Sequence, residues 1–407
     1  MQKQNFLLIK ASFALFLLYF VYDIPAAINT SIIFNNTSAN AQQLSYLYAA
    51  YAMPNMIFPL ISSYFYRYLH NYLVFYIVFM IIIGQKIFTN GLLNENLNIC
   101  IYGRIFYGIG VESYFAFVQN RISILFKEKQ VAMSINIFIA VGRMGTVFTF
   151  FISPLFIERF SIELLNNIAF YIVILATVLI LLLYEKTSMD DIVQNSSAIP
   201  KSDKYAIFLL LQIIFLFACL WSPFYNIAPI MFQIRFGFDK IHASRFLCYI
   251  EGSSIFLGFL IGYFVDYFGN KIFFIMISGI LIFLSHCIFM FKKGPFALAI
   301  TMLAFAAPMM ACYWPCISKL TCEKDMSRLI GIVMCVINTS YMLSPIVTSL
   351  LLRFDKSYFY AEEYLLVLSV LLIYKIFQFL QYNNEKNLKL NEPEIKKRSK
   401  SKINLYP

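Results

Sequence analysis

The stretch E-K-T-S-M-D-D-I-V-Q-N-S-S-A-I-P-K-S-D-K, residues 185–204, is the longest hydrophilic interruption of this sequence before its C-terminal end. Six long apolar runs precede it and six follow it, which predicts two groups of helices joined by a linker. Each run is close to the ~20 residues that a helix needs to cross the hydrocarbon core of a bilayer. The runs are residues 6–29, 44–66, 72–93, 98–126, 130–153, 166–184, 205–234, 243–266, 271–291, 296–321, 328–352 and 358–382.

The composition places these runs in a membrane rather than in water. Hydrophobic residues make up 60% of the 407-residue chain and charged residues only 13%, whereas soluble domains carry about 25% charged residues. Backbone polar groups must be hydrogen-bonded inside lipid, and the sequence lacks the alternation of a barrel, so the runs are expected to be helices. We therefore predict an all-α multi-pass membrane protein with 12 transmembrane helices.

The distribution of charge predicts the orientation. The chain carries a net charge of +11, and much of the excess lies in residues 383–402, directly after the last apolar run. A basic segment beside a membrane helix is typical of the cytosolic side and of contact with anionic lipid, so we expect membrane lipid and no nucleic acid as a partner. Asn35 and Asn36 begin glycosylation sequons in the first loop, which fits an outer face. Both termini are therefore expected in the cytosol.

A loop signature accompanies the division into two groups. The eighth run ends in G-Y-F-V-D-Y-F-G-N-K (residues 262–271), which resembles the signature G-x-x-x-D-x-x-G-x-R/K of the major facilitator superfamily. The counterpart after the second run carries Arg67 at the acidic position. The resemblance implies the superfamily fold and makes Asp266 a candidate for gating. The expected segments are an N-terminal six-helix half (1–184), a cytosolic linker (185–204), a C-terminal six-helix half (205–382) and a basic, disordered cytosolic tail (383–407).

Two opposite charges lie near the centres of neighbouring apolar runs. They are Glu112, in G-R-I-F-Y-G-I-G-V-E-S, and Arg143, in A-V-G-R-M-G-T. A charge at this depth costs at least ~2.5–3.5 kcal/mol, so it needs a partner or a function. One anionic and one cationic group suit a zwitterionic substrate, with its ammonium at Glu112 and its carboxylate at the planar fork of Arg143. The alternative is an ion pair that only holds the two helices together.

Four stretches together resemble one narrower family, the lysosomal dipeptide transporters of the major facilitator superfamily. They are Y-F-V-Y-D-I-P-A-A (19–27), L-Y-A-A-Y-A-M-P-N (47–55), the paired segments of Glu112 and Arg143, and A-C-Y-W-P (311–315). Asn338 is a smaller point of resemblance. The resemblance covers residues 12–350, and the combination is far more specific than any single stretch.

The resemblance implies roles for individual residues. Glu112 is expected to bind the free amino terminus of a dipeptide, and Arg143 its carboxyl terminus. Tyr22 and Asn55 would line the substrate cavity. For any single aromatic residue the alternative is packing or contact with lipid, because the chain contains 28 Tyr and 44 Phe.

Trp314 is one of only two Trp residues, and Pro315 directly after it interrupts the helical hydrogen bonds. We expect Trp314 to form a cavity wall or a gate.

Other titratable residues are candidates for gating or ion coupling. Asp23 lies toward the outer end of the first run, where a solvated helix end is the alternative. Glu251 is a second carboxylate inside an apolar run, which allows either proton linkage or a pair with Arg245. His286 could titrate at acidic lysosomal pH, but a hydrogen-bonded structural histidine is the preferred interpretation.

These features together predict a membrane transporter. The sequence contains neither a Walker-type nucleotide-binding loop nor a grouping of nucleophile, base and orienting residue, so we expect no ATP-driven transport, no enzymatic activity, no cofactor and no metal site. The resemblance implies a uniporter that moves dipeptides from the lumen of a lysosome or vacuole to the cytosol by alternating access. It also implies a glycosylated lysosomal membrane protein as an accessory subunit. The plasma membrane is the alternative location.

Two other functions compete with dipeptide uniport. One is a proton-coupled carrier of another small solute, an amino acid or a sugar, because Asp23 and Glu251 would allow coupling. The other is a non-transporting membrane scaffold or sensor that keeps the same fold.

Overall fold

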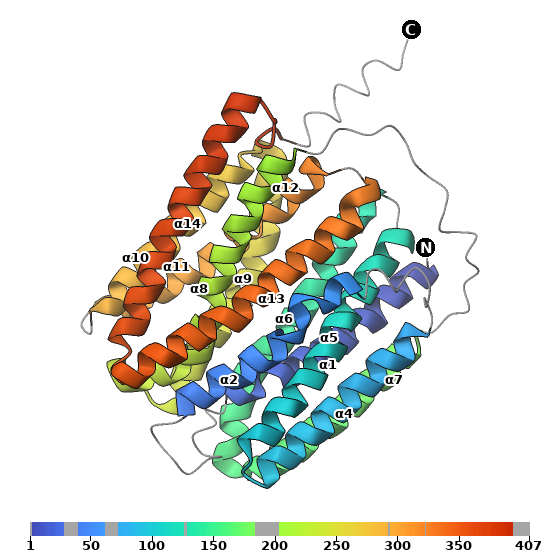
Figure 1. Ribbon diagram of the computed structural model, residues 1–407, viewed down its shortest axis with the longest axis vertical. Helices are drawn as coiled ribbons and strands as arrows, with labels where there is room; N and C mark the ends of the chain where they lie inside the picture. Colours follow the sequence, from blue (N-terminus) through green and yellow to red (C-terminus); the bar gives the residue numbers. More distant parts are fainter. Residues whose placement is uncertain are drawn as a thin grey trace. The chain divides into compact units, whose positions relative to one another are not determined.

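A computed structural model describes residues 2–27, 40–61, 72–125, 128–183, 203–291, 294–321 and 323–393. Within these ranges every regular element is a helix (Figure 1), which confirms the predicted all-α class. Several predicted features lie outside the described residues. They are the linker up to residue 202, the sequons at Asn35 and Asn36, Arg67, and the basic tail beyond Pro393.

The helices follow the predicted apolar runs. Ten of the helices in the described ranges are long and apolar enough to cross a membrane, and these ten do not include α2 or α5. The first group comprises α1 (Gln2–Ala27), α2 (Asn40–Ala52) with the short 3-10 helix η2 (Pro54–Met56), α4 (Leu73–Leu93), α5 (Leu97–Leu125), α6 (Glu128–Arg159) and α7 (Ile162–Leu181). The second group comprises α8 (Lys204–Phe236), α9 (Lys240–Phe268), α10 (Lys271–Met290), α11 (Phe296–Met310), α12 (Tyr313–Leu320), α13 (Glu323–Phe354) and α14 (Phe359–Lys386).

Two predicted runs are interrupted at proline residues. Helix α2 ends at Ala52, and Pro54 opens the short helix η2. The run over 296–321 divides into α11 and α12 around Ala311. Pro315 has no N–H for the carbonyl of Ala311, four residues earlier, so one bond of a regular helix is lost at this point. Instead the N–H of Trp314 donates to the Ala311 oxygen at 3.1 Å, which makes a tighter turn.

The chain divides into two compact units. Unit 1 comprises Met1–Ser197, Trp221–Cys248 and Ser327–Ala361, and unit 2 comprises Ala198–Leu220, Tyr249–Met326 and Glu362–Pro407. The six-helix halves remain a prediction, and each unit is described by itself.

Close helix contacts at glycine residues organise unit 1. Helix α1 packs on α6, and α4 packs on α5. A Cβ atom added to Gly145 of α6 would lie 2.1 Å from the carbonyl oxygen of Phe16, and one added to Gly84 of α4 would lie 2.2 Å from the backbone nitrogen of Tyr107. Only glycine allows backbones to approach so closely, as is common between membrane helices. These contacts fix α1 beside α6 and α4 beside α5.

The C-terminal strap, residues 387–393, fastens helix ends in unit 2. Helix α14 continues beyond residue 382 to Lys386, so the start of the predicted disordered tail is helical. Asn391 then accepts hydrogen bonds at the start of α10, from the N–H of Asn270 to its backbone oxygen (2.8 Å) and from the N–H of Ile272 to its Oδ1 (3.0 Å). Asn270 has a left-handed backbone and makes no side-chain cap itself. The strap therefore supplies the missing cap from a distant part of the chain.

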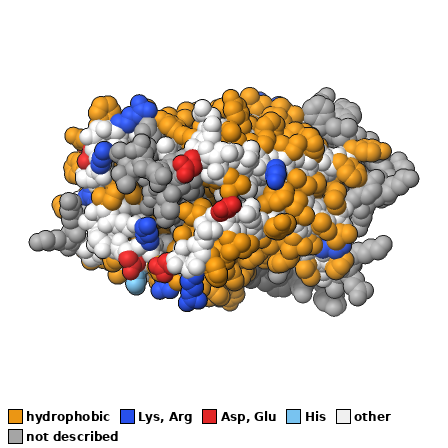
Figure 2. Space-filling view, turned by 90° about the horizontal axis from the view of Figure 1, so that it is seen from below, with side chains coloured by type: hydrophobic (Ala, Val, Ile, Leu, Met, Phe, Trp, Pro, Cys, Tyr) orange, Lys and Arg blue, Asp and Glu red, His pale blue; other side chains and the backbone are white. Residues whose placement is uncertain are grey.

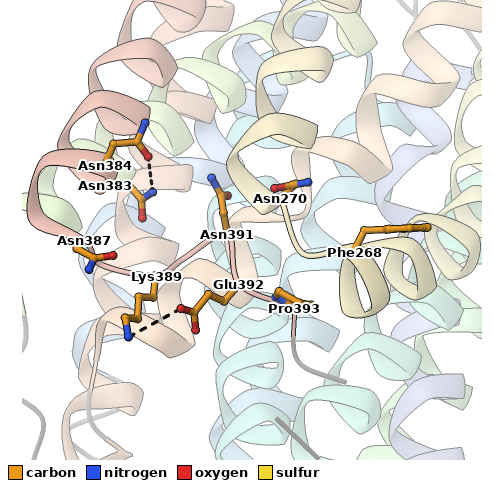
Figure 3. A pocket seen from close by; sticks show the side chains of 9 residues that line it. All are labelled: Phe268, Asn270, Asn383, Asn384, Asn387, Lys389, Asn391, Glu392 and Pro393. Carbon is orange, nitrogen blue, oxygen red and sulfur yellow. Dashed lines mark hydrogen bonds and ion pairs between the residues drawn. The ribbon is translucent and has the colours of Figure 1, made fainter. Parts of the chain in front are cut away.

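The strap also reaches α12. The Lys319 ammonium donates to the backbone oxygen of Glu392 at 3.1 Å. A pocket of about 450 Å³ lies beside the strap, with Asn270, Asn383 and Asn391 among its lining residues (Figure 3). The ends of α10, α12 and α14 are thus held together in unit 2.

The described surface is rich in hydrophobic side chains. On the face in Figure 2 they are abundant, and most of the charged side chains gather in the left part of the view. Large residues such as Phe256 and Tyr171 are 76% and 70% exposed. An exposed apolar surface of this kind suits lipid as the surrounding solvent.

Candidate functional site

A series of side-chain hydrogen bonds positions α1 between α5 and α6 in unit 1. Tyr114 and Tyr107 of α5 donate their hydroxyls to the backbone oxygens of Ala11 and Leu18 at 2.8 and 2.9 Å. Arg104, about one turn before Tyr107 on α5, donates to the backbone oxygen of Tyr22 at 2.9 Å. Polar side chains of this kind hold membrane helices together because no water competes for the carbonyls.

Helix α6 makes the matching contacts from the other side of α1. The Thr149 hydroxyl donates to the backbone oxygen of Phe20 at 2.7 Å. The Thr146 hydroxyl donates to Oδ2 of Asp23 at 2.6 Å. Asp23 is buried, so it is a hydrogen-bonded interior carboxylate rather than the solvated helix end considered from sequence. Its predicted part in gating or coupling stays a prediction.

Glu112 lies in the middle of α5 and has one of its two carboxylate oxygens engaged. The Tyr51 hydroxyl of α2 donates to Oε1 at 3.1 Å. Oε2 is buried, and none of the described residues hydrogen-bonds it. The side-chain amide of Asn338, on α13, is a second hydrogen-bond donor to the same carboxylate. A buried carboxylate oxygen without a donor is costly, so the position suits a cationic ligand.

Arg143 lies on α6 between the two glycines that contact α1. A Cβ atom on Gly142 would meet the Leu15 side chain at 2.5 Å, and Gly145 approaches the backbone of Phe16. Arg143 itself is half-buried. Tyr19 of α1 is within electrostatic range of both Glu112 and Arg143. The two charges predicted from sequence therefore belong to one region of unit 1, with Tyr19 near both.

An aromatic cluster surrounds this region. The Tyr22 ring lies 4.6 Å from the Tyr51 ring and 5.2 Å from the Tyr48 ring, measured between centroids. The guanidinium of Arg104 stacks near Tyr22 and Tyr48, at 5.5 and 5.4 Å from their centroids. The predicted Tyr22 is half-buried among these groups. The cluster supports the Tyr51 hydroxyl that contacts Glu112.

Asn55 is fully buried behind Tyr51. Its Nδ2 donates to the backbone oxygen of Tyr51 at 2.8 Å, and a Cβ on Gly108 would lie 3.0 Å from that nitrogen. The geometry makes Asn55 a support for the α2 backbone next to α5. Its predicted contact with substrate stays a prediction.

The remaining predicted residues belong to unit 2. Trp314 is half-buried at the start of α12 and stacks against Tyr313, with 5.1 Å between ring centroids. Glu251 is buried in α9. Asp266 lies on α9 near its end, and its side chain is outside the described part of the structure. Since the two units are described separately, the roles of these three residues stay predictions.

His286 has a buried partner that the sequence did not suggest. Its Nδ1 lies 2.8 Å from Oε2 of Glu362 on α14, and the two side chains are 2% and 0% exposed. This is the hydrogen-bonded structural histidine preferred from sequence. Glu362 is 76 positions away, so no local pattern could connect the two residues.

Tyr19 and Asn338 are the residues near Glu112 whose positions sequence reasoning did not use. Tyr19 precedes Tyr22 by three positions, so helical spacing puts both on one face of α1 and could have identified it. Asn338 is only a point of family resemblance in the sequence, and nothing in its neighbourhood predicts that it contacts Glu112 of α5.

Comparisons with known proteins agree with this architecture. The family described as Major Facilitator Superfamily matches residues 11–349 and 246–403. The chain is 22% identical to the lysosomal dipeptide transporter MFSD1 of Danio rerio, over 94% of this chain and 88% of that protein. It is 23% identical to the Homo sapiens protein of the same name, over 88% of this chain and 83% of that protein.

Solved structures show the same fold at much lower identity. The human organic anion transporter MFSD10 (TETRAN) aligns with a TM-score of 0.68 at 10% identity, over 92% of this chain and 99% of that one. A bacterial homolog of the human lysosomal transporter Spinster, inward-facing and unoccupied, aligns with a TM-score of 0.66 at 11% identity, over 93% and 98%. At such identities the likeness concerns the fold alone.

Proposed function

Because the chain belongs to the Major Facilitator Superfamily, a superfamily of transporters, we propose that it moves dipeptides across a membrane by alternating access. We further propose that it works as a uniporter, carrying dipeptides from the lumen of a lysosome or vacuole to the cytosol. The names of the MFSD1 relatives support the substrate class and the location. We also propose that a glycosylated membrane protein acts as an accessory subunit and that both termini lie in the cytosol.

The observation that carries the proposal is the state of Glu112. Its Oε1 accepts from Tyr51, while its buried Oε2 has no hydrogen-bond donor among the described residues. The ammonium of a peptide would supply both the positive charge and the missing N–H donor. The empty acceptor therefore supports recognition of a free amino terminus.

Arg143 supplies the opposite end of the substrate. Its planar guanidinium can hold a carboxylate through two parallel hydrogen bonds. Tyr19 is within electrostatic range of both charges, so we expect it to contact the middle of the peptide. A substrate held only by its two termini leaves its side chains free, so we expect broad tolerance of dipeptide side chains.

Ligand-induced thermal stabilisation of the purified protein tests this proposal. Alanyl-alanine is expected to raise the melting temperature, whereas free alanine, N-acetyl-alanyl-alanine and alanyl-alanine amide are not, because each lacks one terminus or the spacing between them. Glu112→Gln and Arg143→Gln should abolish the stabilisation. Arg143→Lys is the matched control for charge, and it should keep only a weak response because it loses the fork.

Uptake of alanyl-alanine into proteoliposomes separates the competing functions. Uptake that proceeds equally with and without a pH gradient supports uniport. Uptake that requires the gradient would instead establish a proton-coupled carrier. If alanyl-alanine still stabilises the Glu112→Gln protein against heat, the proposed binding of the two termini by Glu112 and Arg143 is wrong. Absence of any uptake would favour a non-transporting scaffold or sensor.

A further inference from the structure

The short helix α12 is a separate segment of unit 2 with a hinge at its start. It comprises 8 residues, and the break around Ala311 separates it from α11. Pro315 offers no N–H to the Ala311 carbonyl, so a tighter turn from Trp314 joins the two helices instead of a regular helical bond. A helix of this length has few internal hydrogen bonds. Contacts with neighbouring elements therefore decide the position of α12.

The packing of α12 within unit 2 is apolar on one face. Cys316, Ile317 and Leu320 are buried, and positions three and four apart lie on the same side of a helix. Helix α12 contacts α10. Apolar burial has no preferred direction, so this packing alone leaves the angle of the segment loosely determined.

A directed contact at the far end of α12 comes from the C-terminal strap. Lys319, in the last turn of α12, donates its ammonium to the backbone oxygens of Glu392 (3.1 Å) and Leu390 (3.5 Å). Hydrogen bonds from a charged donor are stronger than neutral ones. They lie at the end of α12 opposite the hinge, so they limit how far the segment can turn.

The strap is itself anchored to other parts of unit 2. Leu390 is fully buried, and its N–H donates to Oδ1 of Asn383 on α14 at 3.2 Å. Asn391 accepts from the start of α10, and a Cβ atom on Gly269 would collide with the Asn391 carbonyl oxygen. Gly269 belongs to the loop signature between α9 and α10. The strap thus connects α12 to this loop and to α14.

The strap also has an open side. A pocket of about 450 Å³ lies along it (Figure 3), and the side chains of Lys389 and Glu392 are 60% and 44% exposed. The printed contacts between the strap and α12 are hydrogen bonds of one ammonium group. Such a contact can open and close without exposing apolar surface of its own.

We propose that the C-terminal strap is a clamp on α12 and that α12 is a local gate. With Lys319 bonded to the strap, α12 stays against α10 and holds Trp314 in place. When Lys319 leaves the strap, α12 turns about the hinge at Ala311 and carries Trp314 with it. Lys319 is therefore a positioning residue for Trp314. The clamp is independent of the substrate, whereas its effect on uptake rests on the proposed function.

Hydrogen exchange in the full-length protein tests the clamp. Lys319→Met keeps the apolar stem and removes the ammonium. Exchange of the α12 amides is expected to accelerate about twofold to tenfold, the usual value of one hydrogen bond, whereas the α11 amides keep their wild-type rates. Unchanged exchange in α12, or equal acceleration in α11 and α12, would overturn the clamp.

Lys389→Met is the matched control. Lys389 lies in the same strap, and among the described residues its ammonium pairs with the Glu392 carboxylate at 3.9 Å. This variant removes a charge from the strap and leaves the contact with α12 intact. Exchange in α12 should therefore stay at the wild-type rate, and acceleration equal to that of Lys319→Met would contradict the role of Lys319.

Uptake of alanyl-alanine into proteoliposomes tests the gate. Lys319→Met should raise the maximal rate by up to about tenfold and leave the half-saturating concentration unchanged, because it eases a conformational step and not substrate binding. An unchanged maximal rate would overturn the gating role. No uptake by the wild type, together with faster α12 exchange in Lys319→Met, would overturn the proposed function and leave the clamp standing.

Discussion

The Tyr51 hydroxyl donates to Oε1 of Glu112 at 3.1 Å and joins α2 to the centre of α5. The ring of Tyr51 is itself held by Tyr22, 4.6 Å away between centroids. This bond fixes one carboxylate oxygen and turns the other away from it. The orientation of Glu112 is thus determined by a residue of another helix.

Tyr51→Phe should therefore weaken dipeptide binding without abolishing it. Loss of one hydrogen bond to the carboxylate lets Glu112 adopt other rotamers, and we expect affinity for alanyl-alanine to fall by about 1–2 kcal/mol. Equilibrium binding to the purified protein measures this effect. Tyr114→Phe is the matched control, because its hydroxyl bonds to the Ala11 backbone instead. It should lower thermal stability and leave affinity unchanged; equal affinity losses in both variants would contradict the prediction.

Hydropathy was sufficient to predict the helices because few backbone conformations other than the helix are stable inside lipid. Each apolar run of about 20 residues must close its own backbone hydrogen bonds. The broken helix around Ala311 was also foreseeable, since Pro315 removes one of those bonds. The C-terminal strap was not, because the bond between Ile272 and Asn391 joins residues 119 positions apart. No local periodicity carries such information.

Gly145→Ala should destabilise the contact between α1 and α6. The new methyl group would lie 2.1 Å from the Phe16 carbonyl oxygen, which is backbone and cannot rotate away. Separating the helices should cost about 1–3 kcal/mol or more. Thermal unfolding in detergent measures the loss. Gly262→Ala is the control, since no atom lies within 4 Å of the added Cβ. If the two variants melt alike, the close approach of α1 to α6 is incorrect.

The site could be predicted only in part, for a related reason. A charge in an apolar run is rare, so Glu112 and Arg143 stand out in the sequence. Asn338 and Tyr19 are ordinary residues whose importance depends on which way their helices face. That orientation follows from long-range contacts such as the Tyr107 hydroxyl on the Leu18 carbonyl. The sequence thus indicates the two charges of the candidate site, and it does not indicate the polar groups around them.

Asn391→Ala should destabilise unit 2 through the start of α10. It removes the Oδ1 that accepts from the Ile272 N–H, and loss of a helix cap costs about 0.5–2 kcal/mol. Asn387→Gly is the matched control, because Asn387 lies in the same strap, is exposed and has a left-handed backbone (φ 49°) that glycine adopts without strain. Hydrogen exchange at the first turn of α10 should accelerate only in Asn391→Ala. Equal protection in both variants would show that the strap does not cap this helix.

Glu362→Gln should destabilise the protein more than any surface change. It replaces the carboxylate oxygen that lies 2.8 Å from Nδ1 of His286 where both side chains are buried, and leaving a buried polar group without its partner costs about 1–3 kcal/mol. Thermal unfolding measures the cost. The double variant His286→Phe with Glu362→Met should recover much of it, because an apolar pair replaces two buried polar side chains of similar volume. The neighbouring exposed Glu363→Gln should be close to neutral, and a loss there equal to that of Glu362→Gln would contradict the assignment.

Asp355, in the turn between α13 and α14, should stabilise the protein across the pH range of a lysosome. Burial raises the pKa of its carboxyl, but hydrogen bonds from Ser357 and from the N–H of Phe359 outweigh this, and the net pKa is lowered. A carboxyl with a lowered pKa stabilises the fold above its unfolded pKa of about 3.9, and the contribution is lost as the pH falls through the lower folded value.

Asp355→Asn should therefore lower the melting temperature by a similar amount at about pH 7 and about pH 5. The difference from wild type should shrink only below about pH 4, where the wild-type carboxylate takes up its proton. A difference that disappears already at about pH 5 would mean that the turn does not hold Asp355 in its charged form.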